Sequence, residues 1–124
     1  GRTEYNEDPN YNGDDDFDGT WAIWDEEFLQ FYCDRMSEMK EPFMTAVFTA
    51  TSHTPYALPE RYKGVFPTSD DPLQECVAYT DHALKRFFES AQKPTARCLL
   101  PHFIGTILCT HHPLCTRRPY TAWI

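Results

Sequence analysis

The chain has 124 residues, of which 41% are hydrophobic and 15% aromatic, and its formal net charge is −8. This length allows one small domain with a modest core and excludes two, and the overall acidity argues against a general nucleic-acid binder. No apolar run approaches the roughly 18 residues of a membrane span, and no secretory leader is recognisable.

The first 20 residues are rich in Asp, Asn, Gly and Pro, so we expect a loop or an extended segment. Within them Asp14, Asp16, Asp18 and Gly19, followed by Asp25, match the spacing of a calcium-binding loop, with Asp in place of the usual bidentate Glu. The residues before this loop do not favour the helix that normally precedes such a site. A solvated acidic loop is the simpler interpretation, and calcium binding is the alternative.

A helix is predicted from Trp24 to Met39. Apolar residues recur there at intervals of three and four, acidic residues occupy the first turn, and Pro42 follows the end. We expect the Met and aromatic stripe of this helix to pack in the core and Cys33 to be a buried thiol.

The segment from Phe43 to Tyr56, FMTAVFTATSHTPY, is predicted to be a buried strand, over Met44 to Phe48, that leads into a polar loop. Ligands usually bind at the carboxyl ends of strands in open α/β sheets, so His53 is the best-placed reactive side chain of the chain. It could serve as a general acid/base or as a hydrogen-bond donor to an anionic substrate. The alternative is an ordinary solvated loop histidine.

A second helix is predicted from about Leu73 to Ala91, with Asp70 or Asp71 as its cap. The order helix, strand, loop, helix indicates an α/β fold.

The pair Asp81-His82 lies inside this second predicted helix. Adjacent helical side chains point about 100° apart, which disfavours a shared metal ion. We expect Asp81 to make a structural hydrogen bond and His82 to be exposed.

Residues 94–124 contain no acidic residue, three cysteines and three histidines. Zinc could be bound by Cys and His side chains here, although their spacing fits no usual zinc pattern; the candidates are Cys98, Cys109, His111, His112 and Cys115. The total of five cysteines is odd, so they cannot all pair within the chain.

Three stretches carry a family resemblance: GTWAIWDEEFLQFYCDRM, KEPFMTAVFTATSHTPYALPERYKG and YTDHALKRFFE. Together they resemble the sulfatase-like domain of the lipoteichoic acid synthase family, within the alkaline phosphatase superfamily, over about residues 10 to 93. The resemblance implies an extracytoplasmic α/β/α domain that binds a divalent metal, typically manganese, and cleaves a phosphate or sulfate ester through a covalent Thr or related nucleophile. In such domains the His of the T-x-[ST]-[NH]-x-P loop contacts the anionic group, and this role falls on His53.

Other parts of the family pattern have no counterpart here. The nucleophile and one metal-binding acid would lie upstream of Gly1, and the Asp-His pair of metal ligands would stand where the chain reads TARCLLPHFIGT. We therefore expect no metal site of its own and no activity from this chain alone. The tail is interpreted as a frame-shifted reading, because a shift of one base in permitted codons yields a sequence typical of the family.

These observations predict a partial three-layer α/β/α sulfatase-like domain over residues 1–93 and an atypical, poorly ordered tail over residues 94–124. The predicted function is a fragment of a metal-dependent phosphoglycerol transferase or sulfatase-type hydrolase, whose parent acts at the extracytoplasmic face of a bacterial membrane on an anionic ester, with no nucleic-acid partner. The alternative is a non-catalytic module that binds calcium or zinc. Exposed strand edges of such a fragment would favour self-association.

Overall fold

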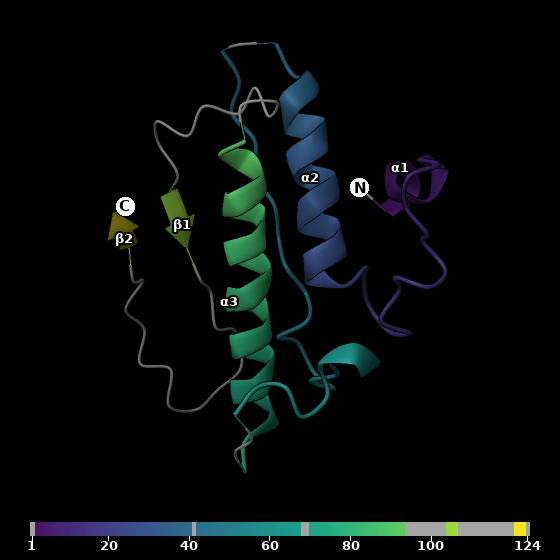
Figure 1. Cartoon of the computed structure of the whole chain (residues 1–124), viewed down its shortest axis with the longest axis vertical. Coiled ribbons are helices and arrows are strands. Elements are labelled where there is room, and N and C mark those ends of the chain that lie inside the picture. Colours follow the sequence, from purple (N-terminus) through teal and green to yellow (C-terminus); the bar gives the residue numbers. More distant parts are fainter. Residues whose placement is uncertain (1, 41, 68–69, 94–103, 107–120, 124) are drawn as a thin grey trace.

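The computed structural model describes residues 2–40, 42–67, 70–93, 104–106 and 121–123. Its elements are α1 (Arg2–Glu7), α2 (Asp25–Glu38), the 3-10 helix η1 (Glu60–Tyr62), α3 (Pro72–Ala91), β1 (Ile104–Thr106) and β2 (Thr121–Trp123). The two short strands pair antiparallel, with Gly105 opposite Ala122. Figure 1 shows that α2 and α3 form the centre of the molecule.

Both long helices were predicted from sequence and are confirmed. The side chain of Asp71 caps α3 by accepting a hydrogen bond from the backbone N–H of Leu73 (3.0 Å), and Pro72 occupies the first helical position. In α2 three acidic residues fill the first turn, where the positive end of the helix dipole favours them.

The two helices lie side by side and run in the same direction (Figure 1). The carboxylate of Asp25, at the start of α2, accepts a hydrogen bond from the hydroxyl of Thr80 in the middle of α3 (2.7 Å). Farther along both helices, the Gln30 side chain accepts one from the hydroxyl of Ser90 (2.7 Å). After the end of α2 the chain turns, and residues 43–50 form an extended segment that runs back in the opposite direction, toward the start of α3. This alternation of direction is the one that helices and strands adopt in α/β proteins.

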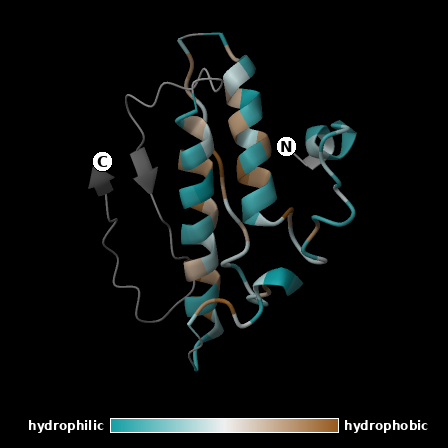
Figure 2. Ribbon diagram, viewed as in Figure 1, coloured by the Kyte–Doolittle hydropathy of each residue, from teal (hydrophilic) through white to brown (hydrophobic). Residues whose placement is uncertain are grey.

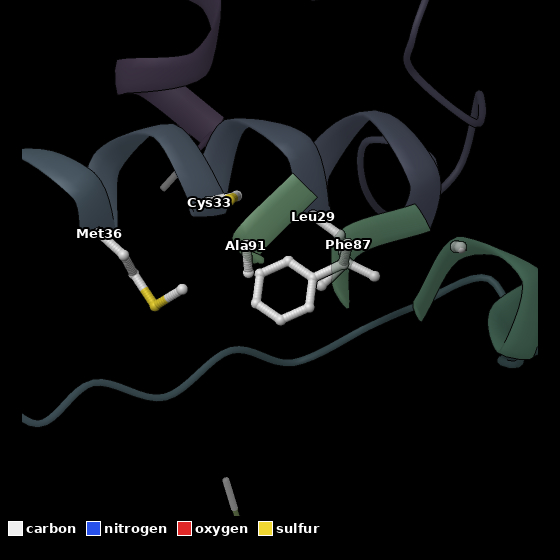
Figure 3. Close-up of a cluster of buried hydrophobic side chains, with 6 residues drawn as sticks. Leu29, Cys33, Met36, Phe87 and Ala91 are labelled. Atoms are coloured by element: carbon white, nitrogen blue, oxygen red, sulfur yellow. The ribbon is translucent and has the colours of Figure 1, made fainter. Parts of the chain in front are cut away.

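The main core lies between α2 and α3. Its buried side chains are Leu29, Cys33, Met36, Ala83, Phe87 and Ala91, and Figure 3 shows five of them converging from the two helices. The outward sides of both helices carry hydrophilic residues (Figure 2). Cys33 is 3% exposed, so the predicted buried thiol is confirmed.

The N-terminal residues differ from the expected loop, because residues 2–7 form α1. Tyr5 is fully buried, its ring centroid lies 5.2 Å from that of Phe31, and its hydroxyl donates to Asp16 (2.7 Å). The prediction weighed the turn-forming composition of the whole stretch, whereas Arg2–Glu7 itself contains neither Gly nor Pro. The contact with Phe31 gives this short helix a core of its own.

The predicted buried strand over Met44 to Phe48 is wrong for this chain. The segment is extended but belongs to no strand, and Met44 and Phe48 are 98% and 85% exposed. Only Val47 packs against the helix core. A strand needs a neighbour for its backbone hydrogen bonds, and neither β1 nor β2 pairs with this segment. The described residues are therefore mostly helical.

None of the described helices is long and apolar enough to cross a membrane. The predicted poor order of the tail concerns residues 94–124, most of which lie outside the described residues.

Candidate functional site

His53 lies in a polar loop built from two successive turns. Its backbone N–H donates to the carbonyl of Ala50 (3.0 Å), and its own carbonyl accepts from the backbone N–H of Tyr56 (2.9 Å). Tyr56 has a φ of 60°, in the left-handed region that a non-glycine residue seldom occupies. The side chain of His53 is exposed, as the polar neighbours in the sequence predicted.

One ring nitrogen of His53 is held by its own loop. Nδ1 lies 3.0 Å from the carbonyl oxygen of Thr54. The hydroxyl of Thr54 lies 3.3 Å from the same nitrogen, so Nδ1 can donate to the carbonyl or accept from the hydroxyl, depending on the tautomer. In both cases Nε2 is the ring nitrogen left to meet a ligand, as an acceptor or a donor according to the protonation of the ring.

Trp21 completes this site, and the sequence reasoning did not single it out. Its indole Nε1 donates to the same carbonyl of Thr54 (2.7 Å), and its ring meets the ring of His53 edge-on with centroids 4.9 Å apart. Trp21 is nevertheless 58% exposed. Only the tertiary structure brings Trp21 and His53 together.

The backbone before Trp21 is fixed by Asp18. One carboxylate oxygen of Asp18 accepts from the backbone N–H groups of Thr20, Trp21 and Ala22 at 2.7, 2.7 and 3.1 Å. This turn, with Gly19 at a φ of +82°, aims Trp21 toward the His53 loop.

The residues of the calcium pattern do not converge. Asp18 is occupied by its own turn, Asp16 accepts from Tyr5, and Asp25 is buried at the start of α2. Within the described residues, no group of three or more His, Cys, Asp or Glu side chains could hold a metal ion. The structure therefore does not support the calcium alternative. The proposed zinc ligands lie outside the described residues.

A polar cluster centred on Glu26 joins α2, η1 and α3. The carboxylate accepts from Tyr62 (2.6 Å) and Arg61 (3.1 Å) and pairs with Arg86 (2.8 Å). Burial by itself would raise the pKa of Glu26, but the hydrogen bonds from Tyr62 and Arg61 and the charge of Arg86 outweigh it and lower this pKa below its ordinary value of 4.5. The neighbouring Glu27 shows the opposite shift, because burial dominates and raises its pKa.

Asp81 was expected to make a structural hydrogen bond and His82 to be exposed, and the structure differs for both. Asp81 is exposed, whereas His82 is half-buried and its Nε2 lies 3.2 Å from the hydroxyl of Tyr62. The rings of Tyr62 and Phe66 pack against His82, with centroids 5.3 and 5.9 Å away. These contacts come from the long connection before α3, which helical periodicity alone does not reveal.

An open cavity of about 360 Å³ adjoins the His53 loop. The loop contributes Tyr56, Ala57 and Leu58, and the remaining lining residues are Asp18, Trp24, Lys63 and Glu75. Aromatic and charged side chains of both signs therefore stand beside the loop.

Comparison with known proteins adds three findings. The Sulfatase family matches residues 2–97, which include both long helices and the His53 loop. The lipoteichoic acid synthase-like YvgJ of Bacillus subtilis (strain 168) is 31% identical over 75 residues, which cover 56% of this chain and 12% of that protein. The chain thus corresponds to a small part of the length of this relative. No solved structure matches the chain.

Proposed function

Because this chain belongs to the Sulfatase family, as its motifs indicated, we propose that it is part of a phosphoglycerol transferase or sulfatase-type hydrolase. The substrate would be a phosphate or sulfate ester, and His53 would contact its anionic group. The observation that carries this proposal is the exposed ring of His53, whose Nδ1 is held by Thr54 while Trp21 packs at its edge.

The chemistry of the ring suits an oxyanion. A fully ionised phosphate or sulfate group offers only acceptors, so it is matched by the imidazolium form of His53, which donates from Nε2. A hydroxyl group of the alcohol part of an ester can instead donate to the neutral ring. Transfer of a phosphoryl group depends mainly on such positioning and on charge compensation.

We infer for the intact domain the three-layer α/β/α fold expected from the motifs. Two features support this. The extended segment runs opposite to α2 and α3, and over residues 46–49 its burial alternates with a period of two, since Val47 and Thr49 are half-buried while Ala46 and Phe48 are exposed. A strand buried on both faces needs a second layer over its outer side, and the apolar Phe48 is suited to lie beneath one.

A divalent metal, with manganese the expected ion, is proposed for the intact domain only. The described residues do not fit a metal site, because they provide no cluster of suitable ligands. The experiment below therefore concerns binding by His53, not turnover. Action at the extracytoplasmic face of a bacterial membrane is likewise proposed for the parent protein.

The proposal is tested by titrating the isotope-labelled chain with inorganic phosphate, glycerol phosphate and sulfate while the ring nitrogens of His53 are followed by nuclear magnetic resonance. We expect a saturable change at Nε2 of His53, with little change at His82, whose Nε2 already faces Tyr62. Chloride at matched ionic strength is the control for screening.

Two variants sharpen the result. His53→Gln removes the ring and should abolish saturable binding, whereas His82→Gln should leave it intact. Equal binding by wild type and His53→Gln, or a response to chloride as large as that to phosphate, would contradict the proposal. A preference for phosphate over sulfate, or the reverse, would identify the class of ester.

The exposed outer side of the extended segment also supports the expected self-association of this chain. Met44 and Phe48 together present apolar surface on a segment with no strand partner among the described residues. We expect sedimentation analysis to show concentration-dependent dimers that Phe48→Lys reduces. Unchanged dimerisation in that variant would place the contact elsewhere.

A further inference from the structure

Asp25 is a buried carboxylate that joins three parts of the chain. It is 1% exposed. Its Oδ1 accepts hydrogen bonds from the backbone N–H groups of Ala50 (3.0 Å) and Thr51 (3.1 Å), and its Oδ2 accepts one from the hydroxyl of Thr80 (2.7 Å). Its own backbone N–H donates to Oγ1 of Thr51 (3.4 Å). The start of α2, the beginning of the His53 loop and the middle of α3 therefore meet at one side chain.

Burial of a carboxylate is costly unless donors surround it. Here two amides and one hydroxyl supply donors, and the first turn of α2 adds the favourable end of a helix dipole. Stabilisation of the helix pair accounts for the bond to Thr80. It does not account for the other two donors, which belong to the loop.

These two amides control the position of His53. The carbonyl of Ala50 accepts the backbone N–H of His53 (3.0 Å), so a fixed Ala50 fixes the first turn of the loop. On the other side of the loop, Trp21 holds the carbonyl of Thr54. Trp21 lies in the short segment before α2, and Asp25 is the first residue of α2, so the two anchors lie close together in the chain.

We propose that Asp25 is a positioning residue for His53, which sets the loop so that the imidazole faces the ester and keeps its contact with Trp21. This inference rests on the proposed function, because the ester gives that position its purpose. It also assigns Asp25 a different task from the calcium ligand that the sequence pattern suggested.

The test compares three substitutions at Asp25 with one at Thr80. Asp25→Asn keeps an oxygen that can accept from the two amides, while its NH₂ group can donate to the Thr80 hydroxyl. Asp25→Ala removes every acceptor. If Asp25→Ala does not fold, Asp25→Ser replaces it, because serine retains a hydroxyl favoured at helix starts but is too short to reach the loop amides. Thr80→Val breaks only the bond to α3.

Three quantities are measured in each folded variant: amide exchange at residues 50 and 51, magnetisation transfer between the rings of Trp21 and His53, and the Kd for inorganic phosphate. In Asp25→Ala or Asp25→Ser we expect exchange faster by about tenfold or more, loss of the ring contact, and phosphate binding weakened by about tenfold. Asp25→Asn should restore most of all three. Thr80→Val should lower stability while the ring contact and the Kd stay within about twofold of wild type.

The inference is overturned if Thr80→Val weakens phosphate binding as much as Asp25→Ser, since both would then act through stability alone. It is also overturned if Asp25→Ser keeps the ring contact and slow exchange. Absence of phosphate binding at His53 in the wild type would refute the proposed function instead, and the exchange and ring-contact measurements would still decide the role of Asp25.

Discussion

Replacement of Glu26 by Gln gives a direct test of the cluster that joins α2, η1 and α3. The side chain of Glu26 is only 9% exposed, whereas its partners Arg61 and Arg86 are 46% and 53% exposed. Tyr62 supplies the third hydrogen bond, from a half-buried hydroxyl. A glutamine at this position has no charge, and its NH₂ group would face side chains that donate hydrogen bonds to the carboxylate.

The expected loss of stability follows from these exposures. Ion pairs with half-exposed arginines contribute up to about 1 kcal/mol each. A hydrogen bond to a charged, buried acceptor contributes about 1.5–3 kcal/mol, which applies to Tyr62. Together we expect Glu26→Gln to lower the free energy of unfolding by about 2–4 kcal/mol near neutral pH.

The contribution of Glu26 to stability should depend on pH in a defined direction. A carboxyl group whose pKa is lower in the native than in the unfolded state contributes stability above its ordinary value of 4.5, and this contribution is lost as pH falls through the native pKa. The difference between wild type and Glu26→Gln should therefore shrink in acid. Urea denaturation followed by circular dichroism at several pH values measures it.

Glu27→Gln is the comparison variant, because the adjacent Glu27 also pairs with Arg61 but burial raises its pKa. Its ionised form is disfavoured in the native state, so its contribution to stability decreases as pH rises above its ordinary value. We expect Glu27→Gln to cost less stability than Glu26→Gln near neutral pH, because only the pair with Arg61 is lost. The reasoning is refuted if both variants lose the same stability, or if the loss in Glu26→Gln is as large in acid as at neutral pH.

Further substitutions test the packing. Phe87→Ala should lower the free energy of unfolding by about 3–5 kcal/mol, because Phe87 is fully buried. Val77→Ala is the control on the same helix, where the side chain is 52% exposed, and should change this free energy by no more than about 0.5 kcal/mol. Equal losses in urea denaturation would show that α3 packs by another face. Gly13→Ala should require the exposed side chain of Asn6 to turn away, because an added Cβ would lie 1.9 Å from its Oδ1, and the loss of stability should be small. The double variant Asn6→Ala/Gly13→Ala should recover stability in thermal unfolding, and no recovery would indicate a clash elsewhere.

Local sequence patterns determined the two long helices. The spacing of apolar residues and the cap at Asp71 depend on neighbours within one or two turns, so they can be read without tertiary information. The motifs around His53 also indicated the Sulfatase family and the loop that carries its histidine. The wrong prediction of a strand over Met44 to Phe48 also follows from the use of local patterns. Local apolarity favours a strand, but it does not reveal the neighbouring strands and layers that would pair with it and cover it.

The arrangement around His53 required the tertiary structure. Trp21 and Thr54 are 33 positions apart in the chain, and Asp25 and Thr80 are 55 apart, so no periodic pattern records that they meet. The same Asp25 that fits a calcium spacing in the sequence is turned inward by donors from the loop and from α3. The sequence by itself thus determined the helices and the family, and it predicted the loop that carries His53. Long-range hydrogen bonds decided how that loop is held, because the cost of burying a carboxylate is met only where distant donors converge on it.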